Sequence, residues 1–67
     1  MKPISGKQFA KLLEHNGWTL LRINGSHHIY GKAGFEARLS VPIHGNEALK
    51  LGLARHLAKL AGIDLED

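Results

Sequence analysis

The chain contains no cysteine among its 67 residues. Disulfide bonds, thiolate zinc sites and thiol nucleophiles are therefore excluded, and a small core must stabilise the fold without cross-links. The sequence also lacks any apolar run near the roughly 20 residues of a transmembrane helix, and its amino-terminal segment lacks the apolar stretch of a signal peptide. These absences predict a soluble, cytoplasmic protein with no membrane contact and a single domain over residues 1–67.

Acidic residues are scarce over most of the chain. Nine Lys and Arg stand against six Asp and Glu, and three of these acidic residues lie near the carboxyl end, at Asp64, Glu66 and Asp67. The rest of the chain therefore has an excess of basic residues, which favours a polyanionic partner such as nucleic acid. The alternative is a basic surface that only keeps the protein soluble. The hydrophobic fraction of 43% and the charged fraction of 22% are ordinary for a globular fold and argue against disorder.

The first helical pattern follows a capping signal. Ser5 and Gln8 have the spacing of a capping box, in which each side chain bonds the backbone N–H of the other residue. Gly17 suits the left-handed position that follows a helix end. Between these signals, apolar residues recur at helical spacing, at Phe9, Leu12 and Leu13. The sequence predicts a helix over residues 6–16.

A second helical pattern occupies the carboxyl-terminal part of the chain. Leucines recur at spacings of four, four and three, at Leu49, Leu53, Leu57 and Leu60. Gly62 is expected to end this helix. Gly52 interrupts the pattern, so the helix begins either near Gly52 or earlier, with Asn46 as its cap.

Three strand patterns lie between the two helices, at residues 18–23, 27–31 and 35–41. Asn24 and Gly25 separate the first two, and this pair is typical of a type I′ hairpin turn. In the third strand, apolar and polar residues alternate without a break, so one face is predicted to be buried. Pro42 cannot donate to a strand ladder and is expected to end this strand.

The order of elements is therefore helix, three strands, helix. Each helix has one apolar stripe and the antiparallel sheet has one apolar face, so both helices are expected to cover that face. The predicted fold class is α+β: a two-layer α-β-β-β-α sandwich with a three-stranded antiparallel sheet, the layout of double-stranded-RNA-binding domains. Such a layout does not by itself give a function.

Five histidines stand out in so short a chain. Two of them, His27 and His28, follow Gly25 and Ser26 at the mouth of the predicted hairpin. Neutral imidazole can accept or donate a proton near neutral pH. RNA supplies its own nucleophile, the 2′-hydroxyl, so one base and a few cations suffice to cut it. The pair indicates a candidate ribonuclease site, with plain strand histidines as the alternative; His15 and His56 are expected to be structural.

Other site chemistries fit the sequence poorly. Zinc needs three or four converging ligands, whereas His27 and His28 are neighbours on a strand and point to opposite faces. His44 and Glu36 are the nearest additional ligands. Ser26 has no acid that would orient a neighbouring imidazole, so it is expected to be a turn residue or a phosphate contact rather than a nucleophile. No metal and no cofactor are predicted.

Several short segments together carry a resemblance to a known family. In order they are Ser5-Gly6-Lys7, Leu12-Leu13-Glu14, Asn16-Gly17-Trp18, Leu21-Arg22, Gly25-Ser26-His27-His28, Val41-Pro42-Ile43-His44 and Ala61-Gly62-Ile63. In this order and spacing they resemble the HicA (YcfA-like) toxins of bacterial toxin–antitoxin pairs. The family usually has Gly-Thr or Gly-Ser at the start of its last helix, where this chain has Gly52-Leu53. The missing cap oxygen is expected to weaken that helix start by about 1 kcal/mol.

The resemblance implies a ribosome-independent ribonuclease that cuts mRNA with a single histidine in the hairpin motif. It also implies a HicB-type antitoxin as the protein partner, which binds the toxin and covers that histidine. The motif histidine corresponds to His27. Strand alternation leaves a question open, because His28 would be the more exposed imidazole if Ile29 faced the helices.

The remaining candidate residues are chosen for charge and expected exposure. The candidate RNA contacts are Lys7, Lys11, Arg22, Ser26, His28 and Lys32, with Arg38 and His44 as further possibilities. Two other functions fit the same pattern. One is a binding module that holds RNA without cutting it, and the other is an interaction domain that docks an acidic protein.

Overall fold

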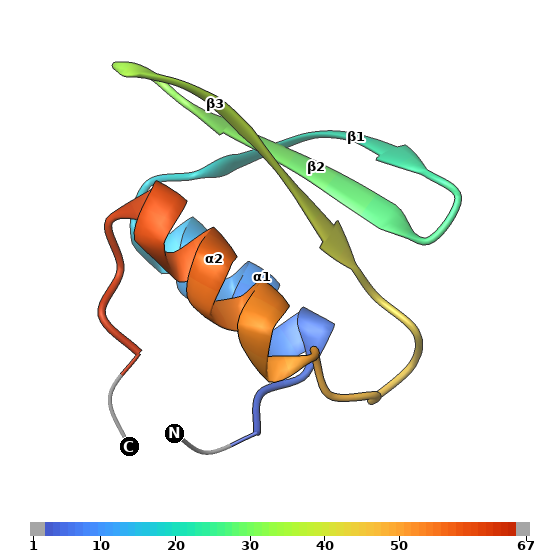
Figure 1. Cartoon of the computed structure of the whole chain (residues 1–67). Helices are drawn as coiled ribbons and strands as arrows, with labels where there is room; N and C mark the ends of the chain where they lie inside the picture. The colour runs from blue at the N-terminus through green and yellow to red at the C-terminus, as the bar shows by residue number, and fades with distance from the viewer. Residues whose placement is uncertain (1–2, 66–67) are drawn as a thin grey trace.

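The computed structural model describes residues 3–65 and has the predicted order of elements. These are α1 (Gly6–His15), β1 (Thr19–Asn24), β2 (His27–Lys32), β3 (Phe35–Pro42) and α2 (Leu51–Ala61). The strands form one antiparallel sheet in the order β1-β2-β3. Both helices lie on the same side of this sheet (Figure 1). The predicted two-layer α+β sandwich is therefore confirmed, and no helix within the described residues is long and apolar enough to span a membrane.

The capping box at the start of α1 is confirmed. The Ser5 hydroxyl accepts a hydrogen bond from the Gln8 amide at 3.1 Å, and the Gln8 side chain accepts one from the Ser5 amide at 3.0 Å. The helix ends at His15, and Gly17 has a φ of 89°. The backbone then turns sharply, because the Trp18 amide donates to the carbonyl of Leu13 at 3.0 Å. Local sequence alone therefore fixes both ends of this helix.

The hairpin turn differs from the sequence-based prediction in its position and its type. Asn24 is the last residue of β1 rather than part of the turn, because it pairs with His27. The central turn residues are Gly25 and Ser26, and only Gly25 has a positive φ, of 62°, which fits a type II′ turn rather than type I′. The α2 helix begins at Leu51. This confirms the predicted start near Gly52 and excludes the earlier start with Asn46 as its cap.

The α2 helix begins without the usual side-chain cap. Its N-cap residue is Lys50, whose side chain makes no capping hydrogen bond, and its first turn contains no acidic residue. At the other end, Gly62 has a left-handed φ of 71° and closes the helix as predicted. Strand β3 includes Pro42 as its last residue.

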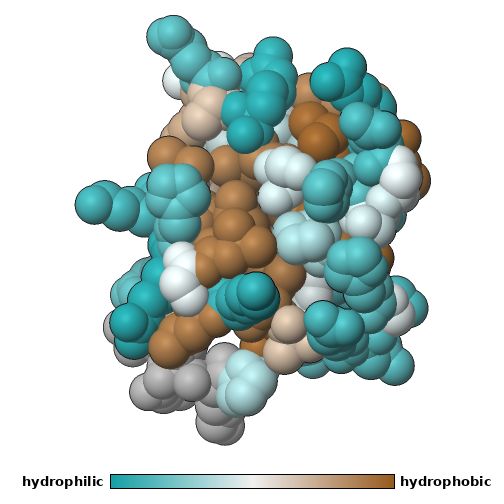
Figure 2. Space-filling view, turned by 45° about the vertical axis from the view of Figure 1, so that its right-hand side comes forward, coloured by the Kyte–Doolittle hydropathy of each residue, from teal (hydrophilic) through white to brown (hydrophobic). Residues whose placement is uncertain are grey.

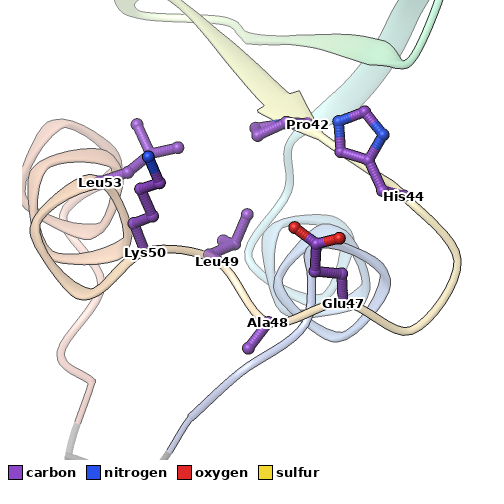
Figure 3. A pocket seen from close by; sticks show the side chains of 7 residues that line it. All are labelled: Pro42, His44, Glu47, Ala48, Leu49, Lys50 and Leu53. Carbon is purple, nitrogen blue, oxygen red and sulfur yellow. The ribbon is translucent and has the colours of Figure 1, made fainter.

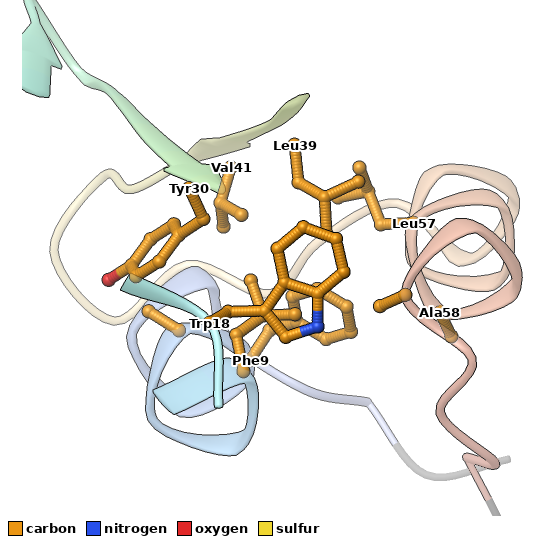
Figure 4. Packing of buried hydrophobic residues seen from close by; sticks show 10 residues of the cluster. Phe9, Trp18, Tyr30, Leu39, Val41, Leu57 and Ala58 are labelled. Carbon is orange, nitrogen blue, oxygen red and sulfur yellow. The ribbon is translucent and has the colours of Figure 1, made fainter. Parts of the chain in front are cut away.

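The core lies between the sheet and the two helices (Figure 4). The largest fully buried side chains are Phe9, Leu13, Leu39 and Val41. Trp18 and Tyr30 are each 2% exposed, and α2 contributes Leu57, Ala58 and Ala61. The Trp18 ring packs against Phe35, with ring centroids 5.1 Å apart. Buried apolar area of this kind is the main source of stability in so small a fold.

The buried phenol of Tyr30 should make stability fall at high pH. Burial raises the pKa of Tyr30 above its ordinary value of 10.0, and the negative charge of Glu14 raises it further. As pH rises past 10, the unfolded chain loses this proton before the folded chain does, so folding becomes less favourable. Tyr30 is the only tyrosine, so tyrosinate absorbance of native and urea-unfolded protein reads it alone. We expect the titration curve of the native protein to lie at higher pH than that of the unfolded protein, and coincident curves would contradict this. The Tyr30→Phe variant should lose this contribution to the fall of stability above pH 10.

Candidate active site

The register of the sheet decides which face carries each hairpin histidine. Tyr30 pairs with Leu39, and His28 pairs with Val41, so His28 lies on the face that the helices cover. His27 belongs to the alternate set and lies on the other face. Its imidazole is exposed, whereas His28 is half-buried.

The same alternation answers the question that the sequence left open. Ile29 lies on the face without helices, in register with Arg22 on β1 and Ser40 on β3. His27 is the next residue on this face, in register with Asn24 and Pro42. We call this side of the sheet the open face and define it by Arg22, His27, Ile29, Gly31 and Arg38.

A bulge in β1 brings Arg22 to the open face. Leu20 pairs with Tyr30 and Arg22 pairs with Ile29, so Leu21 is an extra residue in the strand. Such a bulge turns the side chains of two successive residues toward one side of a sheet. Arg22 therefore lies on the open face, opposite Ile29, which is the next residue after His27 on that face.

Gly31 shows that Leu21 and Arg38 also reach the open face. A Cβ atom at Gly31 would lie 2.8 Å from Cδ1 of Leu21 and 3.3 Å from Cδ of Arg38. Gly31 therefore leaves room for an aliphatic and a cationic side chain to meet across the sheet. Arg22 and Arg38 are both exposed. The open face thus presents one imidazole and two guanidinium groups.

A family model described as the HicA toxin of bacterial toxin–antitoxin systems matches residues 6–63 of the chain. The chain belongs to the HicA toxin family. A search of curated proteins found no match. Membership gives the protein the role of a toxin in a toxin–antitoxin pair and implies an antitoxin partner.

The other candidate RNA contacts of this HicA toxin lie apart from the open face. Lys7 and Lys11 are exposed on α1, in the helical layer. The ammonium group of Lys32 donates to the carbonyl of Asn16 at 2.7 Å and lies 5.1 Å from the centre of the Phe35 ring. It therefore ties β2 to the end of α1. Ser26 is half-buried in the turn, and its carbonyl accepts a hydrogen bond from Ile43 at 2.9 Å.

A hollow at the end of β3 was not predicted from the sequence (Figure 3). It has a volume of about 300 Å³ and lies between the end of β3 and the start of α2. We call it the β3–α2 pocket; its lining residues are Pro42, His44, Glu47, Ala48, Leu49, Lys50 and Leu53. Of these, only His44 was a candidate from the sequence. Most of the others belong to the loop between β3 and α2, and no local sequence pattern specifies the path of this loop.

Apolar surface is also prominent outside the core. Six large apolar side chains are exposed: Leu20, Leu21, Ile23, Phe35, Leu51 and Leu60. On the face shown in Figure 2, apolar surface forms a band with hydrophilic residues on both sides. Half of the six belong to β1, an edge strand in which all six residues are exposed. Exposed apolar residues on an edge strand are typical of a surface that meets a partner.

Within residues 3–65, no group of three or more His, Cys, Asp or Glu side chains converges in a way that would hold a metal ion. The two hairpin histidines in particular lie on opposite faces of β2, as the sequence predicted.

Proposed function

We propose that this HicA toxin is a metal-independent endoribonuclease that cuts mRNA in the cytoplasm, with His27 as its general base or acid. The observation that supports the proposal best is the exposed imidazole of His27 on the open face, which it shares with Arg22 and Arg38. A proton carrier and cations on the same surface suit phosphodiester cleavage at a 2′-hydroxyl.

The chemistry needs no covalent enzyme intermediate. The imidazole of His27 removes the proton of a 2′-hydroxyl, and the oxygen attacks the adjacent phosphorus. The bond from phosphorus to the 5′-oxygen breaks, and that oxygen takes up a proton. The products are a 2′,3′-cyclic phosphate and a free 5′-hydroxyl. Guanidinium groups would stabilise the negative charge that develops on the phosphate oxygens during the attack, because they donate paired hydrogen bonds to such oxygens.

The more distant cations would act on the substrate rather than on the reaction. Lys7 and Lys11 are exposed on α1 and would contact RNA phosphates that run past the helical layer. Ser26 precedes the catalytic residue in the turn and would contact the RNA backbone. His28 follows it, but its place on the covered face sets it apart from an RNA bound at the open face. Lys32 already donates to a backbone carbonyl, so its contribution to RNA would come through its charge.

RNA cleavage should persist in excess EDTA. The proposed mechanism uses a side-chain base and the nucleophile of the RNA itself, so removal of divalent ions should change the rate by less than about threefold, well below the effect of losing an acid–base group. The measurement is cleavage of a defined mRNA fragment by the purified protein, with and without chelator. Loss of activity that zinc or another divalent ion restores would contradict the metal-free mechanism. RNA that is bound but never cut would favour a binding module instead.

The antitoxin would be of the HicB type and would cover His27. Within residues 3–65 the imidazole of His27 is exposed, and the apolar residues of β1 lie beside the hairpin, at the edge of the same sheet. A partner that packs against this edge would exclude RNA from the open face. Competition between antitoxin and RNA for the toxin tests this: a ternary complex that still cuts RNA would contradict it.

A further inference from the structure

We infer that the β3–α2 pocket binds the base of a nucleotide next to the cleaved phosphate, and that it selects guanine. This inference rests on the proposed function, because it assigns a specificity site to the same RNA substrate.

The position of the pocket connects it to the catalytic residue. Pro42 lines the pocket and is also the residue of β3 that pairs with His27 on the open face. The pocket thus lies at the end of the sheet that carries the imidazole, between the last residue of β3 and the helical layer. An RNA strand whose phosphate lies at His27 can therefore place a neighbouring base in the pocket.

The lining of the pocket suits a flat heterocycle. Leu49 and Leu53 are half-buried and form an apolar floor, and the exposed ring of His44 stands at the rim (Figure 3). RNA-binding proteins commonly stack unpaired bases on aromatic and histidine rings. A volume of about 300 Å³ lies at the small end of ligand pockets and fits one base rather than a larger ligand.

Glu47 gives the pocket its selectivity. Its carboxylate would repel phosphate but accept hydrogen bonds from a base that presents donors. Guanine presents two adjacent donors, N1–H and N2–H, which match the two oxygens of a carboxylate. Adenine and cytosine offer an amino group beside an acceptor, and uracil offers one N–H between two carbonyls. Lys50, on the opposite rim, is placed to meet the phosphate of the bound nucleotide (Figure 3).

The test is a titration of the unmodified full chain with the four 5′-mononucleotides, followed by amide NMR shifts. These probes contain no bond that the protein can cut. We expect GMP to shift amides in residues 43–53 and to bind about tenfold tighter than AMP, CMP or UMP. Glu47→Gln should remove this preference. The matched control is Glu36→Gln, at an exposed glutamate of β3 outside the pocket, which should leave the preference intact.

Equal binding of the four nucleotides, or shifts confined to other residues, would overturn the inference. The inference would also fail if the amides of residues 43–53 responded to an apolar peptide but to no nucleotide, which would assign the pocket to a protein partner. The titration does not depend on catalysis. If GMP binds as stated but RNA is never cut, the proposed function fails and the base site stands; if RNA is cut and no nucleotide binds the pocket, only the base site fails.

Discussion

Replacing His27 with alanine is expected to abolish RNA cleavage and growth arrest while the fold survives. Loss of a general acid–base group typically lowers a rate by about 10²–10⁴-fold. The imidazole is exposed on the open face, so its removal should change the free energy of unfolding by no more than about 0.5 kcal/mol. Cleavage of a defined RNA by the purified variant measures the first effect, and urea denaturation measures the second.

The matched control is His56→Ala, because His56 is also exposed but belongs to α2, in the other layer. This variant should cleave RNA at the rate of the unaltered protein. A fully toxic His27→Ala variant would contradict the catalytic assignment. If a folded His28→Ala variant lost all cleavage while His27→Ala kept it, the half-buried neighbour would be the catalytic member of the pair.

Replacing Gly6 with alanine should destabilise the protein by about 2–3 kcal/mol, as is typical of overpacking in a core. Gly6 is buried at the start of α1, where an added Cβ would overlap the carbonyl oxygen of Pro42 and meet Cγ1 of Ile43 at 3.0 Å. Both belong to the segment at the end of β3, so relief would require the helix and sheet to move apart. The higher helix propensity of alanine offsets only about 1 kcal/mol of this cost.

A thermal melt should show this loss as a fall in Tm of roughly 10 °C or more, given the size of the domain. Gly52→Ala is the control, since Gly52 is also helical but exposed, and an added Cβ would meet nothing within 4 Å. That variant should gain about 0.5–1 kcal/mol from helix propensity. Equal stabilities of the Gly6 and Gly52 variants would show that the contact between α1 and the end of β3 tolerates an extra methyl group.

The sequence alone determined the order of the elements, the ends of α1 and the end of α2. These features depend on interactions between residues a few positions apart, such as the bonds between Ser5 and Gln8 or the left-handed φ of Gly62. The split of His27 and His28 between two faces also follows from strand periodicity. The start of α2 was harder to predict, because it lacks a side-chain cap that would mark it.

Only the tertiary structure decided which hairpin histidine faces the solvent. Alternation sorts β2 into two sets, but each set contains an apolar residue, Ile29 in one and Tyr30 in the other. The choice depends on pairing with Leu39 and Val41 of β3, whose burial against the helices is a long-range effect. The same holds for the bulge at Leu21 and for the β3–α2 pocket. Each arises where segments distant in sequence pack together, and no local pattern records such contacts.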